Sequence, residues 1–447
     1  MNYISILQLI ASLSILVVLH ELGHFLPAKW FKTKVEKFYL FFDVKFSLLK
    51  KKIGETEYGI GWLPLGGYVK IAGMIDESND KEFLNHEPQP WEFRSKPAWQ
   101  RLIIMLGGVT VNLILGLFLF AMIFWVYGEE YLPNKEVKYG IFADSIGREL
   151  GFMDGDKIIS IGNKPFEKFN DRSFIMDVAI NDANTFKVER NGEVKEISIN
   201  PEIAKTLTKA SNKYKTIFGP RFPIYVDTLP PDSQLKGKNV QKGDQLIGVN
   251  DSSTLYFNEL QSVLKNHKND SILLSYIRNG KDTLKTMVLV DSIGKIGFGL
   301  KPLNEIFKLD TVSYSLGEAI PYGINYGFRT LNDQIRAIGQ IFKGKIKANE
   351  SLGSLISIGS TFGKVWVWER FWKMTALLSL VLAFMNLLPI PGLDGGHVVF
   401  LLYEVVSGRK PSDKVVEIGT TIGFFLLIGL MIYALGLDIM RLITGQL

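Results

Sequence analysis

The chain has 447 residues, 47% of them hydrophobic and 21% charged, and a formal net charge of +6 at pH 7. It contains no cysteine, which excludes both a disulfide-stabilised domain and a thiolate metal site. The basic excess lacks the clustered basic and aromatic residues typical of nucleic-acid binding, so we expect no nucleic-acid partner. Charge is absent or sparse in four segments of membrane-spanning length, which predicts a polytopic α-helical membrane protein. These segments cover residues about 4–26, 102–127, 372–390 and 418–437.

The first apolar segment ends in the motif H-E-x-x-H, in which His20, Glu21 and His24 are the only titratable residues of the segment. Ionisable side chains are costly at membrane depth, so such a cluster is a functional site by default. On a helix, the i, i+4 spacing places His20 and His24 on one face, where neutral imidazoles can bind a divalent metal. Glu21 lies beside them and can act as the general base that takes a proton from water. The alternative, an exposed polar helix turn, fits an apolar segment poorly.

The next segments carry two further signals. Segment 53–74 is rich in glycine and alternates weakly between apolar and polar residues, which predicts a β-hairpin. The second apolar segment, 102–127, has no charged residue but contains Asn112. An amide in such a segment can hydrogen-bond a neighbouring helix or contact a substrate, and the residues favour neither role for Asn112.

The polar middle of the chain contains an internal repeat. Residues 155–161 and 243–249 both read G-D-x-(I/L)-I-x-(I/V), and each copy is followed closely by an asparagine. A turn, an alternating strand and a second turn predict two small α+β domains, at about 135–205 and 220–305. They resemble tandem PDZ domains, which bind peptide by strand addition or can serve as a steric gate. Residues 315–365 then form a connector with an amphipathic helix, which either lies on the membrane or packs on the repeats.

The third apolar segment ends in Asn386 and the sequence L-L-P-I-P-G-L-D-G-G-H. The two prolines break the helix, and Asp394 then places a carboxylate where the chain unwinds. Such backbone is tolerated at membrane depth only when it is buried in protein or faces water. A catalytic zinc site usually has three protein ligands, so Asp394 and His397 compete for the third position. For Asn386, beside this loop, we favour substrate contact.

Basic residues indicate how the chain crosses the membrane. They cluster at 29–37, 94–101 and 409–414, which are therefore expected on the cytoplasmic side. The middle segment, roughly 128–365, and both termini are then expected outside. No basic region precedes the first apolar segment, so we expect it to be retained and not cleaved as a signal peptide.

These motifs resemble the site-2 protease family of intramembrane metalloproteases. The H-E-x-x-H motif in the first apolar segment and L-D-G-G at 393–396 carry the resemblance. Residues 61–70, GWLPLGGYVK, are similar to the family's G-x-x-P-L-G-G-Y-V loop, and residues 93–101, FRSKPAWQR, to its F-x-S-K-P-x-W-x-R stretch. One departure is at 108–112, GVTVN, which lacks the proline of the family's G-P-x-x-N pattern.

The resemblance implies a fold and an activity. His20, His24 and Asp394 would bind Zn²⁺, Glu21 would be the base, and His397 would have a supporting role. Segment 53–74 would be a membrane re-entrant loop that pairs with an extended substrate and contacts it through the residues Gly66, Gly67 and Tyr68. The protein would be an intramembrane endopeptidase of a bacterial cytoplasmic (inner) membrane, with both PDZ-like domains and both termini in the periplasm.

The resemblance also implies the partners. The protease would cut single-span membrane proteins, such as anti-sigma factors or signal-peptide remnants, within the lipid bilayer, after an upstream site-1 protease has trimmed them. The alternative from another class is a non-catalytic PDZ membrane scaffold, which has little need of Glu21. A metal transporter would require polar residues along several spans, and the second and fourth have almost none.

Overall fold

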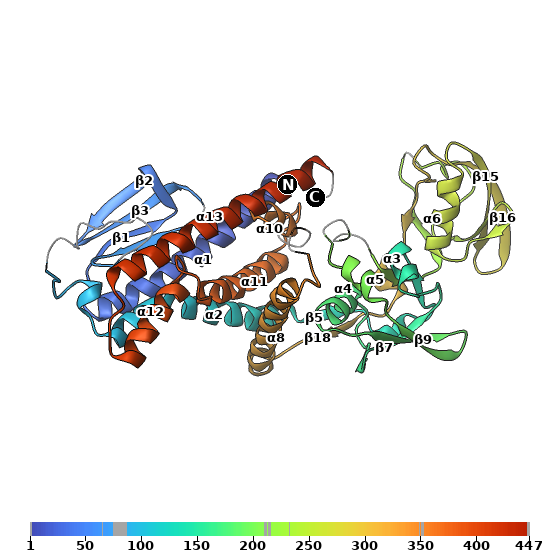
Figure 1. Cartoon of the computed structure of the whole chain (residues 1–447). Coiled ribbons are helices and arrows are strands. Elements are labelled where there is room, and N and C mark those ends of the chain that lie inside the picture. The colour runs from blue at the N-terminus through green and yellow to red at the C-terminus, as the bar shows by residue number, and fades with distance from the viewer. Residues whose placement is uncertain are drawn as a thin grey trace. The chain divides into compact units, whose positions relative to one another are not determined.

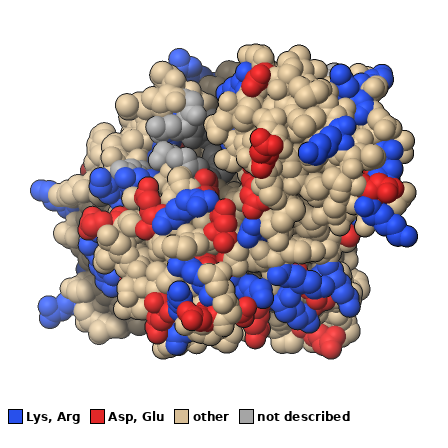
Figure 2. All heavy atoms as spheres, turned by 90° about the vertical axis from the view of Figure 1, so that its right-hand side faces the viewer, with Lys and Arg blue, Asp and Glu red and all other residues tan. Residues whose placement is uncertain are grey.

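The computed structural model describes residues 2–64, 66–74, 87–209, 212, 216–231, 233–347, 349 and 353–444. Leu65, within the predicted hairpin, lies outside the described residues. So do parts of 1–127 and 366–447, which the sequence predicts as the two halves of the membrane protease core, and parts of the predicted segments 220–305 and 315–365. The chain divides into two compact units: unit 1 comprises Met1–Gly128 and Ser313–Leu447, and unit 2 comprises Glu129–Val312 (Figure 1). Acidic and basic side chains are interspersed over the face drawn in Figure 2.

Unit 1 is mainly helical. Its helices are α1 (Tyr3–Trp30), α2 (Ala98–Tyr127), α8 (Leu316–Phe342), α10 (Leu355–Thr361), α11 (Trp368–Leu387), α12 (Asp394–Ser407) and α13 (Asp413–Ile443). Among the described residues, four of these helices are long and apolar enough to cross a membrane: α1, α2, α11 and α13. This agrees with the four predicted segments, although α11 ends at Leu387, because a helix does not normally continue into a following proline, here Pro389.

Helices α1 and α2 cross at glycines. A Cβ atom on Gly23 would lie 2.4 Å from the carbonyl oxygen of Gly107, and one on Gly107 would lie 1.9 Å from that of Gly23. Only glycine permits this approach of two backbones. The crossing therefore sets the distance between the helix that carries the H-E-x-x-H motif and its neighbour.

A four-stranded sheet follows α1 along the chain, and the prediction of a hairpin at 53–74 is wrong. The strands are β1 (Val35–Leu40), β2 (Phe42–Ile53), β3 (Thr56–Leu63) and β4 (Tyr68–Ile71), in the order β2-β3-β1-β4. Strands β3 and β4 lie on opposite sides of β1, so they do not pair with each other. The hairpin is formed by β2 and β3, whose register shifts between Phe42 and Leu49. Positive φ angles at Phe41 and Lys45 change the face to which the following side chains point, so the sequence of this region shows no regular alternation of apolar and polar residues.

Unit 2 contains both predicted repeats. The first repeat has strands β6 (Ile141–Ala143), β7 (Lys157–Ile161), β8 (Lys164–Pro165), β9 (Thr185–Arg190), β10 (Glu193–Ser198) and β11 (Phe218–Pro220), with helices α3 (Ser145–Glu149), α4 (Asp171–Ile175) and α5 (Pro201–Thr206). The second has strands β12 (Ile224–Thr228), β13 (Gln245–Val249), β14 (Ser252–Ser253), β15 (Ser271–Arg278), β16 (Asp282–Leu289) and β17 (Gly299–Leu300), with α6 (Phe257–Asn266). Strand β5 (Glu129–Tyr131) pairs with β18 (Asp310–Val312), and α7 (Leu303–Ile306) precedes β18.

Each repeat has its own buried apolar core. The first core includes Ile217 and Phe218, and β11 pairs with β6, so this repeat extends beyond the predicted boundary at residue 205. The repeats therefore meet near residue 220, close to the predicted start of the second.

The repeated G-D motif has the same structural role in both copies. Asp156 pairs with Arg190 at 2.8 Å, and Asp244 pairs with Arg278 at 2.8 Å, each across 34 residues. Each aspartate also accepts a backbone hydrogen bond at 2.8 Å, from Met153 or Gln241. Burial alone would raise the pKa of Asp244, but the hydrogen bonds from Arg278 and Gln241 outweigh it and lower this pKa. The two copies of the motif therefore have the same local structure.

Helix α8 packs on α2, a contact that the sequence pattern did not indicate. Gly323 and Gly327 lie against α2, where Cβ atoms would meet Ala121 and Leu117. A second apolar stripe of α8 is exposed, and it includes Leu316, Ile320, Ile324 and Phe328. The sequence pattern correctly indicated an amphipathic helix but could not identify α2 as its partner, because both glycines present no apolar side chain.

Candidate metal centre

Three predicted ligands come together from two helices that are distant in sequence. His20 and His24 lie one turn apart on α1, and Asp394 is the first residue of α12. His20 Nε2 is 3.3 Å from His24 Nε2 and 3.3 Å from Asp394 Oδ2, while His24 Nε2 is 3.4 Å from Asp394 Oδ2. Among the described residues, these histidine and carboxylate atoms form a group that could hold a metal ion.

The spacing of these atoms fits zinc. Tetrahedral Zn²⁺ with bonds of about 2.0–2.1 Å separates neighbouring nitrogen or oxygen ligands by roughly 3.3 Å. Asp394 Oδ2 is also buried without a well-formed hydrogen bond, which would be costly for a carboxylate oxygen that had no cation to bind. Two imidazoles and one carboxylate leave the fourth position open, as in catalytic zinc sites.

Helix α2 orients both imidazoles although it contributes no ligand. His24 Nδ1 lies 2.8 Å from the carbonyl oxygen of Ile104, so Nδ1–H donates to this oxygen and leaves Nε2 free to bind metal. His20 Nδ1 lies 3.2 Å from the amide of Asn112, whose Oδ1 has no partner as drawn. Exchanging the two ends of that amide lets Nδ1–H donate to Asn112 Oδ1 and likewise frees His20 Nε2. The contact corresponds to the first predicted role of Asn112, a hydrogen bond between helices.

The other proposed third ligand, His397, does not belong to the group formed by His20, His24 and Asp394 among the described residues. Residues Leu388–Leu393 separate α11 from α12, so the carboxylate enters the site from the start of a helix and not from an irregular loop. Asn386 Nδ2 lies 3.2 Å from His20 Nε2, beside the ligand atoms. Its amide therefore borders the metal centre.

The edge of the sheet lies against Glu21. Strand β4 is the last strand in the order β2-β3-β1-β4, so one of its sides is unpaired within the sheet. Glu21 accepts a hydrogen bond from the backbone of Val69 in this strand. A Cβ atom on Gly67 would lie 2.6 Å from Val17 Cγ1 and 3.6 Å from Glu21 Cγ, so this position requires glycine.

The other two predicted substrate contacts of this loop point elsewhere. The hydroxyl of Tyr68 donates to Asp43 Oδ1 at 2.9 Å, and its ring stacks on Tyr39 at 5.4 Å. Gly66 faces the ring of Phe42: a Cβ atom on Gly66 would lie 3.0 Å from this ring. Tyr68 can therefore contribute to a substrate site through its backbone, while its side chain serves the sheet.

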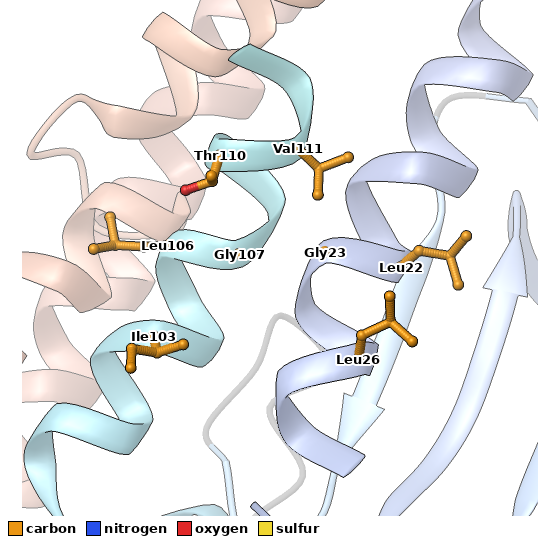
Figure 3. Close-up of a pocket in the computed structure, with 8 residues that line it drawn as sticks. All are labelled: Leu22, Gly23, Leu26, Ile103, Leu106, Gly107, Thr110 and Val111. Atoms are coloured by element: carbon orange, nitrogen blue, oxygen red, sulfur yellow. The ribbon is translucent and has the colours of Figure 1, made fainter. Parts of the chain in front are cut away.

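An apolar recess beside the crossing of α1 and α2 is a separate feature (Figure 3). Its lining residues are Leu22, Gly23, Leu26, Ile103, Leu106, Gly107, Thr110 and Val111. None of them is titratable, so the recess is not the metal centre.

Gly108, which the sequence motif marked only as part of 108–112, lies directly behind the histidines. A Cβ atom there would be 2.4 Å from His24 Nε2 and 2.6 Å from His20 Cε1. We expect Gly108→Ala to lower zinc affinity about tenfold or more, because both ligand rings must shift. Gly116→Ala on the same helix is the matched control, since its Cβ would meet the flexible side chain of Leu380 at 2.6 Å.

Zinc content and thermal unfolding of both purified variants test this expectation. Gly116→Ala should lower only the unfolding temperature. Full zinc retention by Gly108→Ala, or the same zinc loss in both variants, would contradict a specific role of Gly108.

Comparison with known proteins places this geometry in context. The model of peptidase family M50 matches residues 8–430. The regulator of sigma-E protease RseP of Escherichia coli (strain K12) is 26% identical over 97% of this chain and 98% of its own length. The metalloprotease MmpA of Caulobacter vibrioides is 25% identical over 98% of this chain and 96% of its own length. A Rickettsia conorii protein with a zinc metalloprotease name is 28% identical over 99% of this chain. The likeness to the regulator of sigma-E protease, which the motifs also indicate, is thereby confirmed.

Proposed function

Since the chain belongs to peptidase family M50 and is a zinc-dependent metalloprotease, we propose that it cuts the membrane-spanning segments of single-span proteins. The observation that carries this proposal is the location of the ligand atoms. His20 and His24 belong to α1, a helix long and apolar enough to cross a membrane. A peptide bond can reach these ligands only at membrane depth, so the substrate is a segment that resides there.

The residues of the site have complementary tasks in peptide hydrolysis. Bound zinc supplies the Lewis acidity that polarises the scissile carbonyl and acidifies water. Glu21 takes a proton from the attacking water and passes it to the leaving amine. The amide of Asn386, at 3.2 Å from His20 Nε2, can donate to the oxygen that gains negative charge. Glu21 is partly buried beside Val69, which limits its contact with bulk water.

The unpaired side of β4 solves the problem that a substrate helix hides its own backbone. We propose that the substrate segment unwinds and pairs with this strand, next to Glu21. Gly67 lets this part of the chain lie close to α1, and Tyr68 contributes main-chain groups. Strand addition supplies the hydrogen bonds that the unwound backbone needs in a medium without water.

The two repeats, if they are PDZ-like domains in the periplasm, can govern which substrates enter. The positive-inside tendency of the basic loops favours a position of 128–365 on the side of the membrane opposite to the cytoplasm. Anti-sigma factors or signal-peptide remnants that an upstream site-1 protease has trimmed would then pass, and untrimmed proteins would be refused. A bacterial inner-membrane location with both termini outside agrees with the same charge pattern.

Deleting residues 135–305 and joining the flanks with a flexible linker should preserve zinc binding. It should also allow cleavage of substrates with a bulky outer domain, because the steric gate is gone. Cleavage of trimmed and untrimmed substrates by the deletion variant and by the full chain measures this. A folded deletion variant that binds zinc but keeps the original discrimination would remove the gating hypothesis.

The proposed activity can be tested in liposomes that contain the full chain and a single-span substrate. Mass spectrometry of the products should locate the cut within the membrane-spanning segment. A chelator should stop cleavage and added zinc should restore it. A cut in an extramembrane loop would contradict the proposal, and binding without cleavage would favour a non-catalytic scaffold.

A further inference from the structure

Helix α2 contacts both helices that carry the ligands, α1 and α12. Asn112 lies against His20, and the carbonyl oxygen of Ile104 accepts from His24. One turn before Ile104, Arg101 pairs with Glu404 of α12, the helix that begins with Asp394. The first two contacts act on the ligands themselves, whereas the third acts ten residues away from its ligand.

The ion pair is largely buried, with side-chain exposures of 9% for Arg101 and 11% for Glu404. The Nε of Arg101 also donates to the carbonyl oxygen of Lys96 at 2.9 Å. Its guanidinium also lies 6.0 Å from the centre of the Phe93 ring. A buried pair of this kind adds little net stability, but removing one partner leaves the other charge buried without compensation. Its value therefore lies in fixing the relative positions of α2 and α12.

Among the described residues, the buried face of helix α12 is narrow. Its buried face consists of Gly395, Gly396, Val398 and Leu401. Of these, Val398 and Leu401 pack with Ile104 and Met105 of α2 in one apolar cluster. The opposite face is exposed, including Val399, Leu402, Tyr403, Val405 and Val406. Gly395 and Gly396 pack closely on the preceding loop, where added Cβ atoms would lie 2.2 Å from the carbonyl oxygen of Leu388 and 2.6 Å from Cα of Pro391. They bring little apolar area against α2.

We propose that the Arg101–Glu404 pair is a positioning element that holds Asp394 in the metal site. Glu404 lies about 15 Å along the helix from Asp394, and a helix of this length moves as a rigid rod. A shift at Glu404 is therefore transmitted to the carboxylate, whereas the histidines on α1 stay in place. This inference rests on the proposed function only in taking zinc as the bound metal.

Zinc release from the detergent-purified full chain to a chelator tests the proposal, with thermal unfolding recorded in parallel. Glu404→Gln should release zinc about tenfold faster, within the range known for groups that support metal ligands. The reversed pair, Arg101→Glu with Glu404→Arg, should return the rate toward that of the wild type. The matched control is Asp438→Asn, which breaks the buried pair of Asp438 and Arg441 on α13. It should lower the unfolding temperature and leave zinc release unchanged.

A neutral double variant, Arg101→Met with Glu404→Leu, separates positioning from stability. It removes the pair without leaving a buried charge, so its unfolding temperature should match the wild type while zinc release stays fast. Zinc release at the wild-type rate from Glu404→Gln or from this double variant would overturn the inference. A wild-type chain that never holds zinc would instead contradict the proposed function, so the two failures are distinguishable.

Discussion

Glu21→Gln is expected to abolish proteolysis while zinc stays bound. The amide has nearly the same size as the carboxylate, and it can still accept the hydrogen bond from Val69. It cannot take a proton from water, however, and loss of a general base typically costs about 10²–10⁴-fold in rate. His20, His24 and Asp394 are unchanged, so the metal content should equal that of the wild type. Initial rates on a single-span substrate and metal content by mass spectrometry measure both effects.

Glu55→Gln is the matched control for this variant. Glu55 belongs to the same unit, but it is exposed and pairs with Lys29 at 2.8 Å. Its removal should leave the rate unchanged, because exposed ion pairs contribute little. A Glu21→Gln variant within tenfold of the wild-type rate would show that another group is the base. Loss of zinc from this variant would instead show that Glu21 supports the ligands.

The ligand set could be predicted from sequence because short motifs fix local geometry. His20 and His24 are four residues apart on a helix, so no tertiary information is needed to place them on one face. Asp394 required more: its role followed from a family resemblance, since residue chemistry alone left His397 as a rival. The structure supplies the missing distance, 3.3 Å from Asp394 Oδ2 to His20 Nε2.

Other features depend on contacts between distant segments, which periodicity does not encode. The order β2-β3-β1-β4 places β1 between strands that are adjacent in sequence, so local alternation suggested the wrong pairing. Gly108 carries no side chain, and only the crossing of α1 and α2 reveals that it makes room for the histidines. Asn112 left two roles open until its contact with His20 was known. Glu404 was not recognised at all, since a single acid in an apolar helix has many possible partners.

Replacing the ligands one at a time is expected to have the other large effect. His20→Ala, His24→Ala and Asp394→Asn should each lower zinc affinity by more than about 100-fold, because loss of a supporting group alone costs about 10–100-fold. Asp394→Asn is the most informative of the three, since it keeps the volume and removes only the charge. A neutral amide is a weak zinc ligand, and it leaves Zn²⁺ with two neutral imidazoles at a buried position.

His397→Ala provides the control that decides between the two rival ligands. His397 is close to Asp394 in sequence, so any general disturbance of α12 should affect both variants alike. His20 Nε2 and His24 Nε2 lie 3.3 and 3.4 Å from Asp394 Oδ2, and His397 does not belong to this group among the described residues. Its removal should therefore preserve zinc. Metal content by mass spectrometry and thermal unfolding of the four purified variants give the answer. If His397→Ala lost zinc while Asp394→Asn kept it, the third ligand would be the histidine.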